Sequence, residues 1–172
     1  MSAEQIIKGF EGCSLVAYHG AADPSNVWTI GYGTTFYPDG TRVQENDTCT
    51  IEQAEAWLQE HVDQFASIVD HQVQVTINDN QRAALTSFVY NVGSNAFQRS
   101  TLLDMLNNGD YEGASHQFPR WSMANGKQVQ GLLNRRLKEQ ELFNTPVPVM
   151  VAKDIVKPVA KDKKNGRDAN NS

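Results

Sequence analysis

Apolar side chains recur at intervals of three and four along most of the chain, which is the spacing of amphipathic helices. The longest such stretch covers residues 51–69, and two shorter ones cover residues 6–10 and 84–89. Each is preceded by a capping-box pair, in which a short polar residue is followed three positions later by Gln. These pairs are Ser2 with Gln5, Thr50 with Gln53, and Asn78 with Gln81. The pattern therefore predicts three helices with well-defined starts.

The pattern changes between residues 13 and 43, where β-branched and aromatic residues alternate with Gly and Pro. Such a segment is typical of a small antiparallel sheet with tight turns. Helical spacing then returns in residues 100–106, in a short segment from Asp110 to Pro119, and in residues 129–143. The order predicts an α+β fold with a sheet-bearing N-terminal lobe and a helical C-terminal lobe. Substrates commonly bind in the cleft between two such lobes.

Charge divides the chain into a body and a tail. Residues 1–143 hold nine basic and seventeen acidic residues, a net charge of −8, whereas residues 144–172 carry +3. We therefore expect one domain over residues 1–145, large enough to be a catalytic domain, and a mostly disordered basic tail over residues 146–172. An acidic body argues against a nucleic-acid-binding protein.

Other classes are also disfavoured. No apolar run approaches the roughly 20 residues of a membrane-spanning helix. Cys13 and Cys49 are too few for a disulfide scaffold, and we interpret them as small buried residues. No ligand spacing for zinc is present, so a structural zinc site is not expected. The first twelve residues do not have the pattern of a secretory signal.

Three residues around the predicted sheet could carry chemistry. Glu11 ends the first helix beside apolar neighbours, an environment that disfavours its charged form and suits a general acid. Asp23 precedes Pro24 in a loop, and Thr29 lies in the strand that follows. Taken singly, each has an ordinary structural explanation as a surface, turn or strand residue. Together, an acid facing a second carboxylate and a hydroxyl is the arrangement that cleaves glycosidic bonds.

The segment FEGCSLVAYHGAADPSNVWTIGYGTT resembles the signature of the phage-type lysozymes, glycoside hydrolase family 24. Two later segments, DNQRAALTSFVYNVGSNAF and QFPRWSMANGKQVQGLLNRR, are similar to the family's central helix and closing segment. The resemblance aligns Glu11 with the general acid, Asp23 with the catalytic carboxylate and Thr29 with the threonine of the signature strand. The loop before Asp23 is longer than in typical members, with the extra residues at Gly20–Ala22, and Thr34 replaces a common His.

The resemblance implies a lysozyme-like two-lobed fold, and it implies no metal or cofactor. The implied activity is inverting hydrolysis of the β-1,4 bond between N-acetylmuramic acid and N-acetylglucosamine in peptidoglycan. We expect saccharide contacts from Tyr32, Thr34, Tyr90 and Asn91, because aromatic faces suit sugar rings and Asn can bond acetamido groups. A virion-associated lysozyme, a lytic transglycosylase and a sugar-binding module with an inactive site remain as alternatives.

The resemblance also sets expectations for the setting of the protein. We expect a monomer that accumulates in the host cytoplasm, does not insert into the membrane, and reaches the wall with help such as a holin. The acidic body predicts no long-range attraction to the polyanionic wall, unless a local basic patch at Arg135 and Arg136 near the cleft governs binding.

Overall fold

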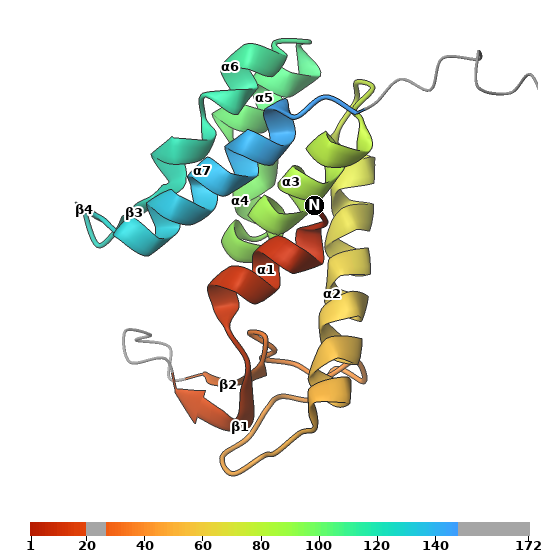
Figure 1. Cartoon of the computed structure of the whole chain (residues 1–172), viewed down its shortest axis with the longest axis vertical. Helices are drawn as coiled ribbons and strands as arrows, with labels where there is room; N and C mark the ends of the chain where they lie inside the picture. Colours follow the sequence, from red (N-terminus) through yellow and green to blue (C-terminus); the bar gives the residue numbers. More distant parts are fainter. Residues whose placement is uncertain (20–26, 148–172) are drawn as a thin grey trace, which may run out of the picture.

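The computed structural model describes residues 1–19 and 27–147. Two lobes are joined along one side by a long helix, α2, and by α1, which lies at their junction (Figure 1). The elements run in this order: α1 (Ala3–Glu11), β1 (Ser14–His19), β2 (Trp28–Gly31), α2 (Ile51–Gln72), α3 (Asp79–Val92), α4 (Ser94–Gln98), α5 (Thr101–Asn107), α6 (Tyr111–Ser115), the 3₁₀ helix η1 (Phe118–Trp121), β3 (Met123–Ala124), β4 (Lys127–Gln128) and α7 (Gln130–Asn144). The predicted α+β order of a sheet lobe followed by a helical lobe is confirmed.

The three predicted capping boxes are all formed. Ser2, Thr50 and Asn78 accept hydrogen bonds from backbone N–H groups at the third helical position, and the Gln at that position bonds back to the cap. These reciprocal bonds satisfy donors that a helix otherwise leaves without partners. The starts of α1, α2 and α3 are thus fixed locally by the sequence.

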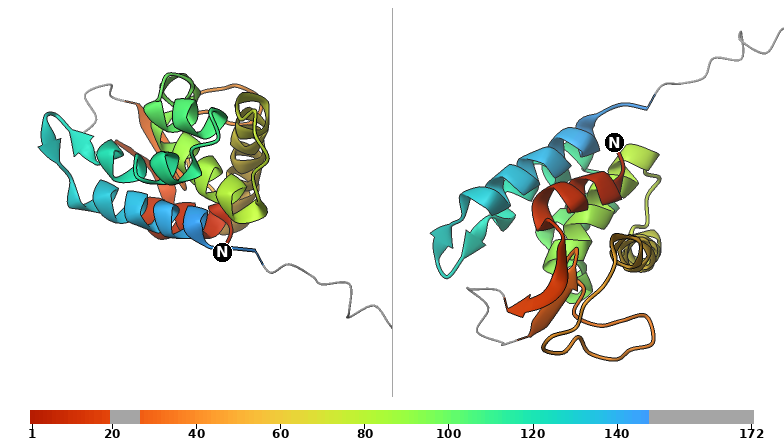
Figure 2. Two further views of the ribbon diagram at one scale, coloured as in Figure 1. Left: turned by 90° about the horizontal axis from the view of Figure 1, so that it is seen from above. Right: turned by 60° about the horizontal axis from the view of Figure 1, so that its bottom comes forward.

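The helical lobe has the larger core. Its buried cluster contains fourteen residues, drawn mainly from α3, α5 and α7. Phe88 lies at its centre, with ring contacts to Phe97, Phe118 and Trp121 at centroid distances of 5.4–6.2 Å. Figure 2 shows α1 and α7 lying side by side across α3, so the end of α1 is held against this lobe.

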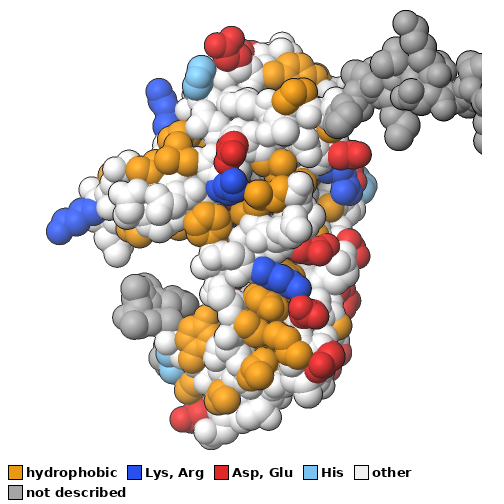
Figure 3. Space-filling view, viewed as in Figure 1, with side chains coloured by type: hydrophobic (Ala, Val, Ile, Leu, Met, Phe, Trp, Pro, Cys, Tyr) orange, Lys and Arg blue, Asp and Glu red, His pale blue; other side chains and the backbone are white. Residues whose placement is uncertain are grey.

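The sheet lobe is thin by comparison. β1 and β2 pair antiparallel, with Tyr18 opposite Thr29, and the register is interrupted between Ser14 and Tyr18. Its buried cluster consists of Ala17, Ile30 and Val43. Hydrophobic side chains are visible on its surface in Figure 3, and Leu15, Val16, Tyr18 and Phe36 are each at least 40% exposed.

Some details differ from the sequence-based expectations. Cys13 is exposed and Cys49 is partly buried, so the interpretation of both as buried residues is wrong for Cys13. Cys13 follows the C-cap Gly12 and lies outside both lobes' cores. The short helix α4 and the β3–β4 hairpin were not predicted, because each holds too few residues to show a period. The predicted tail, residues 146–172, lies outside the described residues from position 148 onward.

Candidate active site

Glu11 is the last residue of α1 and lies where the two lobes meet. Gly12 ends the helix with φ of 68°, a left-handed conformation that suits glycine and turns the chain into β1. The Glu11 carboxylate accepts a hydrogen bond from Nη1 of Arg135 at 2.5 Å. The Glu11 side chain remains 26% exposed, whereas that of Arg135 is only 3% exposed. Glu11 is therefore anchored from inside the protein while one side still faces solvent.

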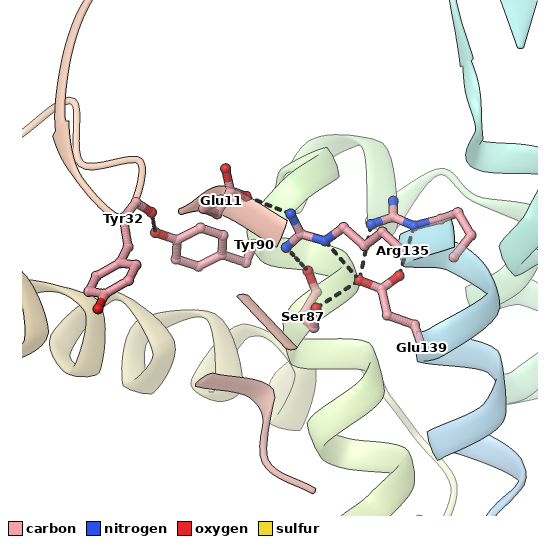
Figure 4. A network of polar contacts seen from close by, with 7 residues as sticks. Glu11, Tyr32, Ser87, Tyr90, Arg135 and Glu139 are labelled. Carbon is pink, nitrogen blue, oxygen red and sulfur yellow. Dashed lines mark hydrogen bonds and ion pairs between the residues drawn. The ribbon is translucent and has the colours of Figure 1, made fainter. Parts of the chain in front are cut away.

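Arg135 comes from α7 and uses its whole guanidinium group (Figure 4). While Nη1 bonds Glu11, Nε donates to Oε1 of Glu139 at 3.2 Å and Nη2 donates to the carbonyl of Ser87 at 3.2 Å. No pattern in the sequence pairs Arg135 with Glu11. The one available signal was the Arg135–Glu139 spacing of four residues on a helix, which predicts a pair on one face but not what else it contacts.

Arg135 and Arg136 do not form the basic surface patch that was an alternative from the sequence alone. Their side chains are 3% and 0% exposed, and both contact Glu139, which is also completely buried. The Arg136 guanidinium further lies over the ring of Phe88, 4.9 Å from its centroid. These cations are neutralised in the interior, so they cannot attract the wall at long range.

Tyr90, near the end of α3, links that helix to the sheet lobe. Its hydroxyl donates to the backbone carbonyl of Tyr32 at 2.8 Å. Burial and the charge of Glu11 both raise the pKa of Tyr90 well above its ordinary value. The phenol is therefore a neutral hydrogen-bond donor throughout the working range of pH.

Gly33 lies against the same two side chains. A Cβ at this position would lie 3.6 Å from Oε2 of Glu11 and 3.7 Å from the Tyr90 hydroxyl, and φ is 97°. A larger residue would be strained by this φ, and its Cβ would be in contact with both side chains. The glycine lets the backbone of the sheet lobe approach the candidate acid closely.

The predicted saccharide-binding residues fall into two groups. Tyr32 and Thr34 are buried, with 8% and 1% exposure; Tyr32 packs among residues of α1 and α2, and the Thr34 backbone pairs with Ile30. Their predicted contact with saccharide stays a prediction, and both have a clear packing role.

Tyr90 and Asn91, in contrast, line open pockets on neighbouring surfaces. Tyr90 and Gly33 line a pocket of about 310 Å³ between the sheet lobe and α2. Asn91 is exposed and lines a pocket of about 620 Å³ with Arg99, Arg120 and Trp121 on the helical lobe. Figure 3 shows the molecule hollowed between the two lobes.

Of the predicted water-binding residues, Thr29 is described and Asp23 is not. Thr29 is half-buried in β2 opposite Tyr18. Burial and the charge of Glu11 raise the pKa of Tyr18, so Glu11, Tyr18 and the Tyr18–Thr29 pair belong to one neighbourhood. Asp23 lies outside the described residues, and its role stays a prediction.

The described parts of the chain, residues 1–19 and 27–147, contain no cluster of three or more His, Cys, Asp or Glu side chains placed to bind a metal ion. Within the same ranges, no helix combines the length and apolar character needed to cross a membrane.

Comparison with known proteins defines the class. Residues 8–139 match the phage lysozyme family, and the chain belongs to that family. It is 43% identical over 148 residues to an endolysin of Bacillus phage PZA, covering 86% of this chain and 55% of that one. It is 42% identical to an endolysin of Acyrthosiphon pisum secondary endosymbiont phage 1, covering 81% of this chain and 93% of the relative.

A solved structure shows the same architecture. The muramidase domain of SpmX from Asticaccaulis excentricus superposes with a TM-score of 0.74 at 32% identity, covering 84% of this chain and 95% of that domain. The chain spans little more than half the length of the PZA endolysin, whereas it spans nearly all of the second relative. The predicted lysozyme-like fold is confirmed.

Proposed function

We propose that this protein is an endolysin that hydrolyses the β-1,4 bond between N-acetylmuramic acid and N-acetylglucosamine in peptidoglycan. One observation carries the proposal: the partly exposed carboxylate of Glu11 lies at the lobe junction and is fixed there by the buried Arg135. The family membership and the muramidase relative support the same substrate.

In the proposed reaction, Glu11 donates a proton to the glycosidic oxygen as the bond to the muramic acid carbon breaks. Asp23 and Thr29 hold a water molecule on the opposite face of the sugar ring. This water attacks the anomeric carbon and loses its proton to Asp23, so the configuration inverts. The scheme predicts a separation of about 6.5–9.5 Å between the carboxyl groups of Glu11 and Asp23.

The pockets beside the end of α3 supply a binding path consistent with a long polymer. Because Tyr90 lines one and Asn91 the other, a glycan chain passing the end of α3 would contact both pockets. Both residues could then contact saccharide. Tyr32 and Thr34 flank Gly33, which lines the same pocket as Tyr90, and we propose them as further saccharide contacts.

The biological setting is proposed from the same family membership. The protein would act as a monomer, collect in the host cytoplasm and reach the wall after a partner such as a holin opens the membrane. The catalytic domain would comprise residues 1–145, with residues 146–172 as a dispensable basic tail.

The decisive test is Glu11→Gln, with purified peptidoglycan as substrate and mass spectrometry of the products. We expect hydrolysis to fall by about a hundredfold or more, because leaving-group protonation is lost, while the melting temperature changes little. Hydrolysis by Asp23→Asn should fall by a similar factor in the same assay. Glu4→Gln, at the other end of the same helix, is the matched control and should retain activity.

The products separate the alternatives. Reducing muramic acid ends identify a hydrolase, whereas anhydro-muramic ends would identify a lytic transglycosylase. Near-normal clearing by the Glu11→Gln variant would reject Glu11 as the acid. Wild-type protein that binds peptidoglycan but releases no fragments would instead identify a binding module.

A further inference from the structure

Glu139 is a completely buried carboxylate that the proposed reaction does not use. Its Oε1 accepts hydrogen bonds from the Ser87 hydroxyl at 2.7 Å, from Arg136 Nη2 at 3.0 Å and from Arg135 Nε at 3.2 Å. Its Oε2 lies 2.8 Å from Arg136 Nε. Burial raises the pKa of Glu139, while the two guanidinium groups and the Ser87 hydroxyl act in the opposite direction. Such a dense set of partners leaves the side chain a single position.

This position is transmitted to the candidate acid through one planar group. The guanidinium of Arg135 bonds Glu139 by Nε, the Ser87 carbonyl by Nη2 and Glu11 by Nη1 (Figure 4). Because the guanidinium is rigid and planar, fixing two of its nitrogens fixes the third. The direction from which Glu11 receives its hydrogen bond is therefore determined by α7 and α3.

The cluster also affects the charge that the Glu11 carboxylate faces. A lone guanidinium 2.5 Å from Glu11 would stabilise its carboxylate form and oppose proton donation. Glu139 lies on the other side of the same guanidinium and offsets its positive charge. Glu11 therefore faces one end of an ion pair instead of an isolated cation.

Stability by itself does not account for such an arrangement. Buried ion clusters can often be replaced by apolar side chains with no loss of stability, because removing the charges from water is expensive. Because this cluster contacts the partly exposed carboxylate of Glu11, it has a further consequence for that carboxylate.

We propose that Glu139 is a positioning residue for Glu11: through Arg135 it orients the Glu11 carboxylate and offsets the positive charge that this carboxylate faces. The proposal rests on the general-acid role of Glu11 proposed above.

The charged and titratable groups around Glu11 make this testable by pH. From α7 these are Arg135, Arg136 and Glu139; from α3, Tyr90; and from β1, Tyr18. The pKa of each tyrosine is raised, so neither titrates in the range where a lysozyme is assayed. At high pH the rate falls because the general acid has lost its proton, and this side of the pH–rate profile is its descending limb. A shift of the descending limb along the pH axis then reports on the α7 cluster.

The experiment compares Glu139→Gln with Arg135→Gln and with the control Glu141→Gln. Glu141 lies two residues further along α7, 67% exposed and paired only with Lys138, so it matches the charge change without touching the cluster. We expect Glu139→Gln to lower kcat on soluble glycan fragments about tenfold, with KM nearly unchanged. The descending limb of the pH–rate profile of Glu139→Gln should move to lower pH by about one pH unit, because the positive charge of Arg135 is no longer offset.

Arg135→Gln should move the same limb to higher pH, because it removes the cation itself. Opposite movements in two neighbouring variants are not expected from a general loss of structure. Glu141→Gln should leave kcat, KM and the limb as they are in the wild-type protein. A folded Glu139→Gln variant with an unmoved limb would overturn the proposal, whether or not kcat fell.

A second comparison serves if Glu139→Gln does not fold, since that variant leaves Arg136 without its anion and Arg135 with Glu11 alone. Arg136→Met and the double variant Arg136→Met with Glu139→Gln differ only in whether Arg135 is offset. The descending limb of the double variant should lie at lower pH than that of Arg136→Met. Descending limbs at the same pH would again overturn the proposal. Failure of the proposed function looks different: Glu11→Gln would then be active, whatever Glu139 does.

Discussion

The two lobes differ sharply in how they are held together. The helical lobe has fourteen residues in its buried cluster, including the stacked rings around Phe88, whereas the sheet lobe has three. The sheet lobe consists of two strands with an interrupted register and has several exposed apolar side chains. A sheet of two strands is marginal by itself, so this lobe depends on α1 and α2 for its stability. The difference suggests that fixed geometry in this molecule comes from the helical lobe.

The candidate site is divided along the same line. Glu11 is bonded to the helical lobe through Arg135, which Ser87 and Glu139 hold. Thr29, in contrast, lies in the thin sheet. The candidate acid is therefore attached to the well-packed lobe, and Thr29, one of its proposed water-binding partners, is attached to the other one. The geometry of the site then depends on the contacts that join the lobes.

The largest expected effect tests the contrast in packing. Phe88→Ala should lower the free energy of unfolding by about 3–5 kcal/mol, since it opens a cavity among rings that cannot collapse onto it. Ile30→Ala, the matched truncation in the sheet lobe, should cost about 2 kcal/mol, at the low end for such a change. Urea denaturation measures both. A larger loss for Ile30→Ala than for Phe88→Ala would contradict the contrast.

A smaller effect tests the link between the lobes. Tyr90→Phe removes the hydroxyl that donates to the Tyr32 carbonyl, so we expect a loss of about 1–2 kcal/mol and a fall in kcat of several-fold. Tyr111→Phe is the matched control, because its hydroxyl donates to the Thr76 carbonyl within the helical lobe and is exposed. It should leave kcat unchanged. Equal kcat values for the two variants would show that the Tyr90 bond does not couple the lobes to the reaction.

The smallest effect concerns pH and the contact of α2 with the sheet lobe. Burial lowers the pKa of His61, which lines the pocket beside Phe36. The unfolded chain therefore binds a proton more readily, so this contribution to stability is present above about pH 6.5 and is lost as the pH falls toward the lowered value. Between pH 7 and pH 5, the melting temperature of His61→Gln should fall by about 1–3 °C less than that of the wild-type protein.

His71→Gln, at the exposed end of the same helix, should keep the wild-type pH dependence. Scanning calorimetry at several pH values makes the comparison. A His61→Gln curve parallel to that of the wild-type protein would show that this histidine does not contribute to the pH dependence.

Much of the local structure could be predicted from the sequence, because its causes are local. The caps Ser2, Thr50 and Asn78 bond backbone groups three residues away, so the helix starts follow from neighbours in the chain. Glu11 was identified by its place at a helix end and by its family resemblance. The elements that the sequence did not predict are short: α4 and the β3–β4 hairpin have too few residues to show a period.

The sequence alone determined that residues 3–11 form a helix ending in a carboxylate at the edge of a small sheet. Only the tertiary structure decided what that carboxylate contacts. Arg135 is 124 positions away from Glu11, and both arginines could equally have been surface cations by composition. They are buried because α7 packs across α1 and α3, and a buried cation must find an anion. That pairing of distant charges depends on how the helices pack, which no local pattern in the chain records.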